Sequence, residues 1–197
     1  MSAGFRTLQF RLILSAIDRG LDLSCKLVVP RREDEPMTHV VLRVLAYCLF
    51  CQDEPGEGLH IAPGPADRDG PDLLARDLIG QPSEWIICGP PDIEELRYVM
   101  QHQRQTKIRI LLGSDHEREH FLAGILSFRR TLPGLSTVDL RQVDAAFLEA
   151  LAAEVVERQR WLVTVVDGHV YVDLGARSLD GEVFPVRLPS DEEMHPR

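Results

Sequence analysis

The sequence predicts an α/β fold in which a β-sheet is flanked by helices, and three observations support this prediction. Strand-like and helix-like segments alternate in the middle of the chain, between residues 84 and 158. Alternating apolar residues on both sides of Asp18-Arg19-Gly20 predict a hairpin near the N-terminus. A second hairpin is predicted near the C-terminus, because Asp167-Gly168 is a preferred two-residue loop between two β-rich segments.

The first part of the chain is predicted to be this N-terminal hairpin followed by a helix. The hairpin strands cover Phe5–Ile17 and Leu21–Val29. The helix covers Met37–Cys51, where apolar residues at helical spacing are joined by others that indicate burial on most sides. Asp34 is its expected N-cap, and Pro36 suits the first helical turn.

The remaining elements follow from local patterns. Residues 53–71 are rich in Gly, Pro, Asp and Glu and predict irregular structure with a short strand at Leu59–Ala62. Further strands are predicted at Glu84–Cys88, Lys107–Leu112, Leu135–Val143, Trp161–Val166, His169–Leu174 and Val183–Leu188. Helices are predicted after the caps Asp92 and Ser114 and over Ala145–Arg158.

The composition predicts one domain that needs no disulfide or metal to hold its core. The chain has 197 residues, of which 44% are hydrophobic and 27% are charged, as in ordinary globular proteins. We expect the domain to cover residues 1–189 and a disordered acidic tail to follow at 190–197.

The sequence also bears on the compartment. No membrane span is predicted, because Arg43 interrupts the longest apolar stretch, Val40–Cys51. Residues 1–10 lack the apolar core of a secretory signal. We therefore expect a cytoplasmic protein with reduced cysteines. The pair Cys48 and Cys51 has the spacing of half a zinc site, but no second pair follows, and buried thiols are the favoured interpretation.

The charge balance disfavours nucleic acid as a partner. The net charge is −9, and an acidic surface repels a phosphate backbone. The adjacent basic pairs Arg31–Arg32 and Arg129–Arg130 are not interleaved with aromatic residues. Solvated surface is the favoured interpretation of both pairs.

One segment matches a catalytic zinc motif. His116-Glu117-Arg118-Glu119-His120 has the form H-E-x-x-H, in which two histidines on one helix face hold zinc and the glutamate activates water. No further histidine follows closely, so the third ligand would be an acid such as Asp139. The competing interpretation, which we favour, is a charged and exposed first helical turn.

A set of carboxylates suggests a different metal chemistry. Asp72, Asp77 and Glu84 precede the predicted buried strand at Trp85–Cys88. Metal-dependent nucleases use two or three acids to hold Mg²⁺, usually with a lysine that helps to activate water. Solvated acids, which are common in an acidic protein, are the alternative.

Three segments carry a family resemblance. Glu35 followed by Leu42-Arg43-Val44-Leu45-Ala46-Tyr47 is similar to a family segment E-T-x-x-R-M-M-L-R-L-L-A-W. Asp77-Leu78-Ile79-Gly80, Trp85-Ile86-Ile87-Cys88-Gly89 and Pro91-Asp92 are similar to D-L-T-G…W-I-E-x-G-x-P-D. The hairpin around Asp167-Gly168 is similar to a terminal hairpin. Over roughly Phe5 to Leu188 the chain resembles the YaeQ family, bacterial proteins whose fold is a variant of the PD-(D/E)xK restriction-endonuclease-like fold.

The resemblance implies a mixed β-sheet flanked by helices and a nuclease-type site that is incomplete. The family's acid in W-I-E falls on Ile87, and a lysine of its following helix falls on Tyr98, beside Arg97. Glu35 and Asp77 keep the family's acids and are the weak candidates for metal ligands. We expect these residues to form a vestigial site with Ile87 facing the point where the acids converge.

Three functions remain open. The first is a YaeQ-like protein without catalysis that acts through an unknown protein partner. The second is an active Mg²⁺-dependent nuclease with a migrated acid, Glu84, and a substitute base, Lys107. The third is a zinc hydrolase that uses His116 and His120.

Overall fold

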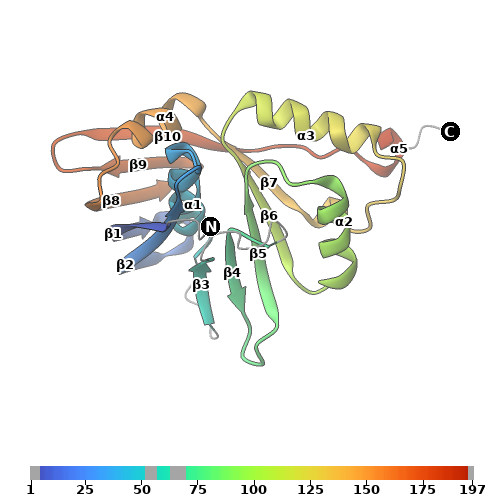
Figure 1. Cartoon of the computed structure of the whole chain (residues 1–197), viewed down its shortest axis with the longest axis horizontal. Helices are drawn as coiled ribbons and strands as arrows, with labels where there is room; N and C mark the ends of the chain where they lie inside the picture. Colours follow the sequence, from blue (N-terminus) through green and yellow to red (C-terminus); the bar gives the residue numbers. More distant parts are fainter. Residues whose placement is uncertain (1–4, 52–56, 63–69, 195–197) are drawn as a thin grey trace.

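The computed structural model of the chain describes residues 5–51, 57–62 and 70–194. The strands are β1 (Phe5–Ala16), β2 (Leu21–Arg32), β3 (Glu57–Ile61), β4 (Leu73–Arg76), β5 (Pro82–Cys88), β6 (Lys107–Leu112), β7 (Asp139–Val143), β8 (Arg158–Val166), β9 (His169–Asp173) and β10 (Ser178–Pro185). The helices are α1 (Met37–Phe50), α2 (Ile93–His102), α3 (Asp115–Ser127), α4 (Ala145–Ala153) and α5 (Asp191–Met194). Within the described residues the ten strands form one mixed sheet in the order β2-β1-β8-β9-β10-β7-β6-β5-β4-β3 (Figure 1).

One half of this sheet is built from the two predicted hairpins. β1 and β2 pair antiparallel, and β1 pairs parallel with β8. β8 and β9 form the C-terminal hairpin. Its loop residues Asp167 and Gly168 have φ values of 50° and 78°, the left-handed conformation that a type I′ turn requires at both positions. The Asp-Gly prediction is therefore confirmed.

The other half is a parallel arrangement with helical crossovers. β5, β6 and β7 are parallel neighbours, and α2 and α3 connect them in sequence. β4 and β3 extend this half as antiparallel strands. β10 joins the halves, because it pairs with β9 through Ser178–Glu182 and with β7 through Val183–Pro185.

Helix α1 is the centre of the larger hydrophobic core. It contacts β1, β2 and β8 from one half of the sheet and β3, β4, β5 and β6 from the other. Most of its side chains are buried, as expected of a helix that is apolar on most sides. The second core lies between α2, α3 and the opposite face of β5–β7, around Leu96, Ile110 and Phe121.

Local details differ from the sequence-based expectations. The helix predicted over Ala145–Arg158 ends at Ala153, and Arg158 is instead the first residue of β8. Leu135–Val143 is a 3-10 turn followed by β7 rather than one strand. Pro36 occupies the N-cap position of α1 without a side-chain hydrogen bond, whereas Asp34 pairs with Arg32.

The end of the described chain also departs from expectation. Residues 191–194 of the expected disordered tail form helix α5, and Met194 is buried in the second core. Residues 195–197 lie outside the described residues. None of the described helices is long and apolar enough to cross a membrane.

A test of the α4–sheet packing uses Gly181 of β10. A Cβ at this position would lie 2.4 Å from the Cβ and Cγ of Phe147 on α4, far inside van der Waals contact. Gly181→Ala should lower the free energy of unfolding by about 1–3 kcal/mol through overpacking, measured by urea denaturation. The matched control is Gly124→Ala in α3, where the nearest atoms are 3.5 Å away. That variant should be stabilised by roughly 0.5–1 kcal/mol, because alanine is the better helix former. Equal effects of the two substitutions would contradict this packing.

Candidate functional site

Two acids and two cations gather where α1 begins. Glu35 lies two residues before α1, and His39 and Arg43 follow on one face of the helix at i+4 spacing. Asp72 immediately precedes β4, which lies in the other half of the sheet from β2. We call Glu35, His39, Arg43 and Asp72 the α1 network.

Glu35 is held by three donors. Its Oε1 is 2.7 Å from His39 Nδ1 and accepts a hydrogen bond from Arg43 Nη1 at 3.0 Å. Its Oε2 accepts the backbone N–H of Arg32 at 3.2 Å. Both carboxylate oxygens are therefore occupied by donors from the chain.

Asp72 is held in a similar way. Its Oδ2 accepts the backbone N–H of Cys88, the last residue of β5, at 2.8 Å. Its Oδ1 lies 3.5 Å from His39 Nε2 and 3.7 Å from Arg43 Nε. The side chain is only 14% exposed, so these cations compensate its charge in a largely dry setting.

Arg43 is the buried member of the network. Its side chain is 1% exposed. Besides Glu35 it donates to the carbonyl of Pro30 on β2 at 3.0 Å and to the carbonyl of Ala62, just after β3, at 2.8 Å. The planar guanidinium suits such divergent acceptors better than an ammonium group does.

His39 is placed to carry a proton on both ring nitrogens. Nδ1 faces Glu35, and Nε2 lies 3.1 Å from the carbonyl oxygen of Cys88. Both partners are acceptors, and a neutral imidazole has one N–H alone. Burial acts to lower the pKa of His39, but the Glu35 hydrogen bond and the charge of Asp72 outweigh it and hold this pKa above its usual value.

The two acids respond differently to the same surroundings. Burial acts to raise the pKa of Glu35, but the His39 hydrogen bond and the Arg43 charge outweigh burial and set this pKa below its usual value. Burial also raises the pKa of Asp72, and there the charges of His39 and Arg43 do not fully offset it. Glu35 is thus the firmly ionised acid of the network.

The α1 network does not fit a hard metal ion. Mg²⁺ needs several oxygen ligands that converge on one point, but the oxygens of Glu35 and Asp72 already face arginine, histidine and backbone N–H donors. Among the residues that the structure describes, no group of three or more His, Cys, Asp or Glu side chains is arranged to hold a metal.

The structure does not bring Asp77 to Glu35. Asp77 lies in the turn between β4 and β5, where its Oδ1 accepts the amides of Ile79 at 3.0 Å and Gln81 at 2.8 Å. Because β4 separates it from Asp72, the two acids are roughly 16 Å apart along the strand at ~3.3 Å per residue. Asp72 rather than Asp77 is the acid that meets Glu35.

Ile87 also lies elsewhere than expected. Side chains alternate along β5, so that Ile86 and Cys88 join the core around α1 while Ile87 packs with the second core. Ile87 therefore faces α2 and α3 and not Glu35. The expectation that it points at the converging acids is wrong.

Arg97 and Tyr98 lie on α2, on the same side of the sheet as Ile87. Arg97 Nη1 is 3.9 Å from Glu94, and Tyr98 is 62% exposed and stacks on His102. Tyr98 lines a cavity of about 510 Å³ with Trp85, Asp92, Glu95, Val99 and Gln103. The vestigial-site candidates are thus divided between the two faces of the sheet.

Glu84, the acid that the Mg²⁺-nuclease hypothesis offers as a metal ligand, forms an ion pair with an arginine. Arg109 donates to both of its oxygens, at 2.8 and 3.2 Å, and also to Asp139 at 2.7 Å. Lys107 Nζ lies 3.8 Å from Glu84 and is 59% exposed. The pairing also removes Asp139 as a zinc ligand, because its oxygens bind Arg109 and Arg141.

The H-E-x-x-H motif occupies the first turns of α3. His116 and His120 are exposed, with ring centroids 6.4 Å apart. Glu117 accepts the amide of Gly113 at 2.7 Å, while its own amide donates to the cap Ser114 at 3.2 Å. The glutamate therefore closes the helix start, which is the structural role expected of a capping residue.

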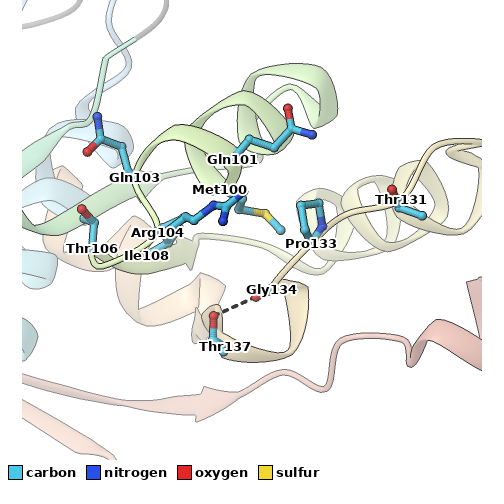
Figure 2. Close-up of a pocket in the computed structure, with 10 residues that line it drawn as sticks. All are labelled: Met100, Gln101, Gln103, Arg104, Thr106, Ile108, Thr131, Pro133, Gly134 and Thr137. Atoms are coloured by element: carbon cyan, nitrogen blue, oxygen red, sulfur yellow. Dashed lines mark hydrogen bonds between the residues drawn. The ribbon is translucent and has the colours of Figure 1, made fainter.

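A larger cavity has none of these acids in its lining. It has a volume of about 640 Å³ and opens between the end of α2 and the segment before β7 (Figure 2). Its lining is mixed: Met100, Gln101, Gln103, Arg104, Thr106, Ile108, Thr131, Pro133, Gly134 and Thr137. None of the site residues predicted from the sequence belongs to it.

Sequence reasoning missed His39 and Arg43 as partners in a site. In the sequence, Arg43 interrupts an apolar stretch, and His39 has no partner pattern around it. The usable signal was Arg43 itself, because a cation within an otherwise buried helix requires acceptors.

Comparisons with known proteins agree with one another. A family model described as YaeQ protein matches residues 1–183. The crystal structure of YaeQ protein from Xanthomonas axonopodis pv. citri is similar with a TM-score of 0.75 and 22% identity, covering 95% of this chain and 100% of that one. YaeQ protein from Pseudomonas syringae gives a TM-score of 0.75 and 24% identity, covering 92% and 96%. No curated protein matches.

Removal of the buried cation should destabilise the fold. Arg43→Leu leaves Glu35 and Asp72 without one of their two shared cations, and we expect a loss of about 3–5 kcal/mol in unfolding free energy. Arg43→Lys keeps the charge but loses the fork of donors and should lie between Arg43→Leu and wild type. The control Arg187→Leu, on an 80% exposed side chain, should not change the urea midpoint. An Arg43→Leu protein as stable as wild type would refute the structural role.

The network should also make stability depend on pH. The raised pKa of His39 means that its stabilising charge is present below the ordinary imidazole pKa and is lost as pH rises through the folded-state value. The stability difference between wild type and His39→Gln should therefore shrink from pH 6 to pH 9, measured by denaturation at each pH. A difference that is constant over this range would show that His39 is not protonated in the network.

Proposed function

The chain belongs to the YaeQ family, and from this premise we propose that it acts by binding, with a nuclease-type site converted into a structural ion-pair network. The proposal includes the finer fold assignment, a variant of the restriction-endonuclease-like fold, which the family resemblance implies. Fold alone does not assign an activity, so the proposal depends on the state of the acids.

The observation that carries the proposal is the occupation of the candidate acids. Glu35 and Asp72 face Arg43 and His39, and Glu84 faces Arg109. A divalent ion would have to displace a guanidinium that also satisfies the carbonyls of Pro30 and Ala62. Such displacement would leave buried carbonyls and a buried cation unpaired, which is costly.

The α1 network is also nearly neutral as a unit. Two ionised acids oppose an arginine and a protonated histidine, so little net negative charge remains to attract Mg²⁺. Carboxylate charge sets the affinity of hard-metal sites. The network is better suited to fixing the position of α1 than to catalysis.

One observation keeps a Mg²⁺-dependent nuclease as the second candidate. Glu84 and Lys107 are direct partners across the parallel strands β5 and β6, which is an acid and a lysine side by side. Arg109 holds both oxygens of Glu84, and for that reason we place this function second.

The proposed partner is another protein, and the proposed setting is the cytoplasm. All four cysteines are free thiols, and Cys48, Cys51 and Cys88 are buried. Reduced thiols are usual in a reducing compartment. Burial raises the pKa of Cys51 to about 11, so this thiol stays protonated and unreactive at neutral pH.

Metal titration tests the proposal directly. Calorimetric titration of Mg²⁺ and Mn²⁺ into the metal-free protein should give no binding at millimolar metal, for wild type and for Glu35→Gln and Asp77→Asn alike. The proposal fails if wild type binds and Glu35→Gln does not, while Asp77→Asn, altered in the distant turn, binds as wild type does. Cleavage of a DNA duplex by wild type and not by Glu84→Gln would establish the second candidate instead.

A further inference from the structure

In the described part of the chain, no helix covers the outer face of one half of the sheet. It belongs to β2, β1, β8, β9 and β10, on the left of Figure 1, whereas α2, α3 and α5 lie on the right. Side chains alternate along these strands, so that Phe10 and Leu12 enter the core around α1 while Arg11 and Ile13 point outward. The outward residues of β1, β2, β8, β9 and β10 form what we call the outer face.

One end of the outer face is basic. Arg11 is directly opposite Lys26 on β2 and directly opposite Arg160 on β8. Arg158 lies two residues from Arg160 on the same side of β8. All four side chains are exposed, and the strand register alone brings them together from three separate parts of the sequence.

These cations have no acidic partners in the described part of the chain, where no ion pair or hydrogen bond involves their side chains. Like charges directly opposite one another on neighbouring strands destabilise a sheet. Arg11, Lys26 and Arg160 form two such pairs. Because this repulsion lowers the stability of the monomer, we expect an anionic partner to compensate the positive charges.

The other end of the same face is acidic. Asp180 on β10 is opposite Tyr171, Glu182 is opposite His169, and Asp173 follows on β9. These acids are exposed. Gly181, between Asp180 and Glu182, packs against Phe147 of α4 on the inner side, which confirms that the two acids point outward.

Apolar side chains lie between the charged ends. Ile13 and Leu162 are direct neighbours across β1 and β8, and Leu162 is 38% exposed. Tyr171 on β9 is 45% exposed. A central apolar strip with charged flanks matches the organisation of protein–protein interfaces, in which charge is depleted at the centre and tyrosine is enriched.

We propose that the outer face is the interface of a symmetric dimer with a second copy of this chain. A twofold axis in the plane of the interface, perpendicular to the line from basic to acidic end, lays the basic end of each copy on the acidic end of the other. The central strips around Leu162 and Tyr171 then meet each other. Such an interface is self-complementary, as a twofold dimer requires.

The size of the face is adequate. Five strands about 4.8 Å apart and roughly 30 Å long cover an area on the order of 700 Å² before side-chain relief is counted. A standard stable interface buries about 800 Å² from each partner. A polyanion such as single-stranded nucleic acid fits less well, because a strand that crosses the face meets Asp173, Asp180 and Glu182.

Charge reversal provides the test. In the first variant, Arg11→Glu with Arg160→Glu removes the net positive charge of the basic end, because the two new acids balance Lys26 and Arg158. In the second, Asp180→Lys with Glu182→Lys makes both ends basic. In analytical ultracentrifugation at 50 mM salt, wild type should be a dimer at micromolar concentration, and each variant should dimerise at least tenfold more weakly. An equimolar mixture of the two should associate more tightly than either variant alone, because the acidic end of the first variant then meets the basic end of the second.

The matched control reverses exposed arginines in the loops that follow α2 and α3. Arg104→Glu with Arg129→Glu changes the net charge as the first variant does and should leave the dimer intact. Circular dichroism verifies that each variant is folded.

A wild type that is monomeric at 100 μM, or a folded mixture that does not associate, overturns the proposal. Monomeric wild type that binds a labelled oligonucleotide, with binding lost in the first variant, would identify a polyanion surface instead.

Discussion

The buried guanidinium of Arg43 is the constraint to which the N-terminal half of the molecule is fitted. Its acceptors are the carbonyls of Pro30 on β2 and of Ala62 just after β3. These two strands are the edges at opposite ends of the strand order. One side chain therefore ties both edges of the sheet to α1. Because a buried cation without compensating acceptors is strongly destabilising, the curvature of the sheet around α1 and the position of Glu35 and Asp72 are set together.

The same constraint gives the carboxylates beside α1 a structural role. An acid that binds a metal ion is indispensable to metal-dependent catalysis. In the same way, an acid that neutralises the buried charge of Arg43 is indispensable to the fold. Glu35 serves in that capacity here, supported by His39. Similarity to YaeQ structures at 22% and 24% identity concerns the fold, so the chemistry of this chain has to be argued from its own side chains.

Local signals in the sequence were sufficient for most elements but not for the site. The Asp167-Gly168 turn, the caps Asp92 and Ser114, and the apolar helix after Pro36 each depend on neighbouring residues. The α1 network depends on Asp72 and Arg43 meeting across the sheet, and no periodicity encodes that contact. The prediction of Asp77 as a partner of Glu35 is wrong for the same reason. Asp72 and Asp77 lie at opposite ends of β4, and the sequence does not show which end lies near Glu35. The register that aligns Arg11 with Arg160 was likewise invisible in a chain of net charge −9.

The parallel pairing of β1 with β8 has a consequence for biosynthesis. β1 and β2 are consecutive strands of one hairpin, but the free edge of β1 cannot be covered until β8 emerges from the ribosome, with most of the chain already made. Pairing between strands so distant in sequence is slow, and exposed strand edges are prone to aggregation in the meantime. Nascent chains of this protein should therefore depend on holding chaperones until the C-terminal hairpin is released.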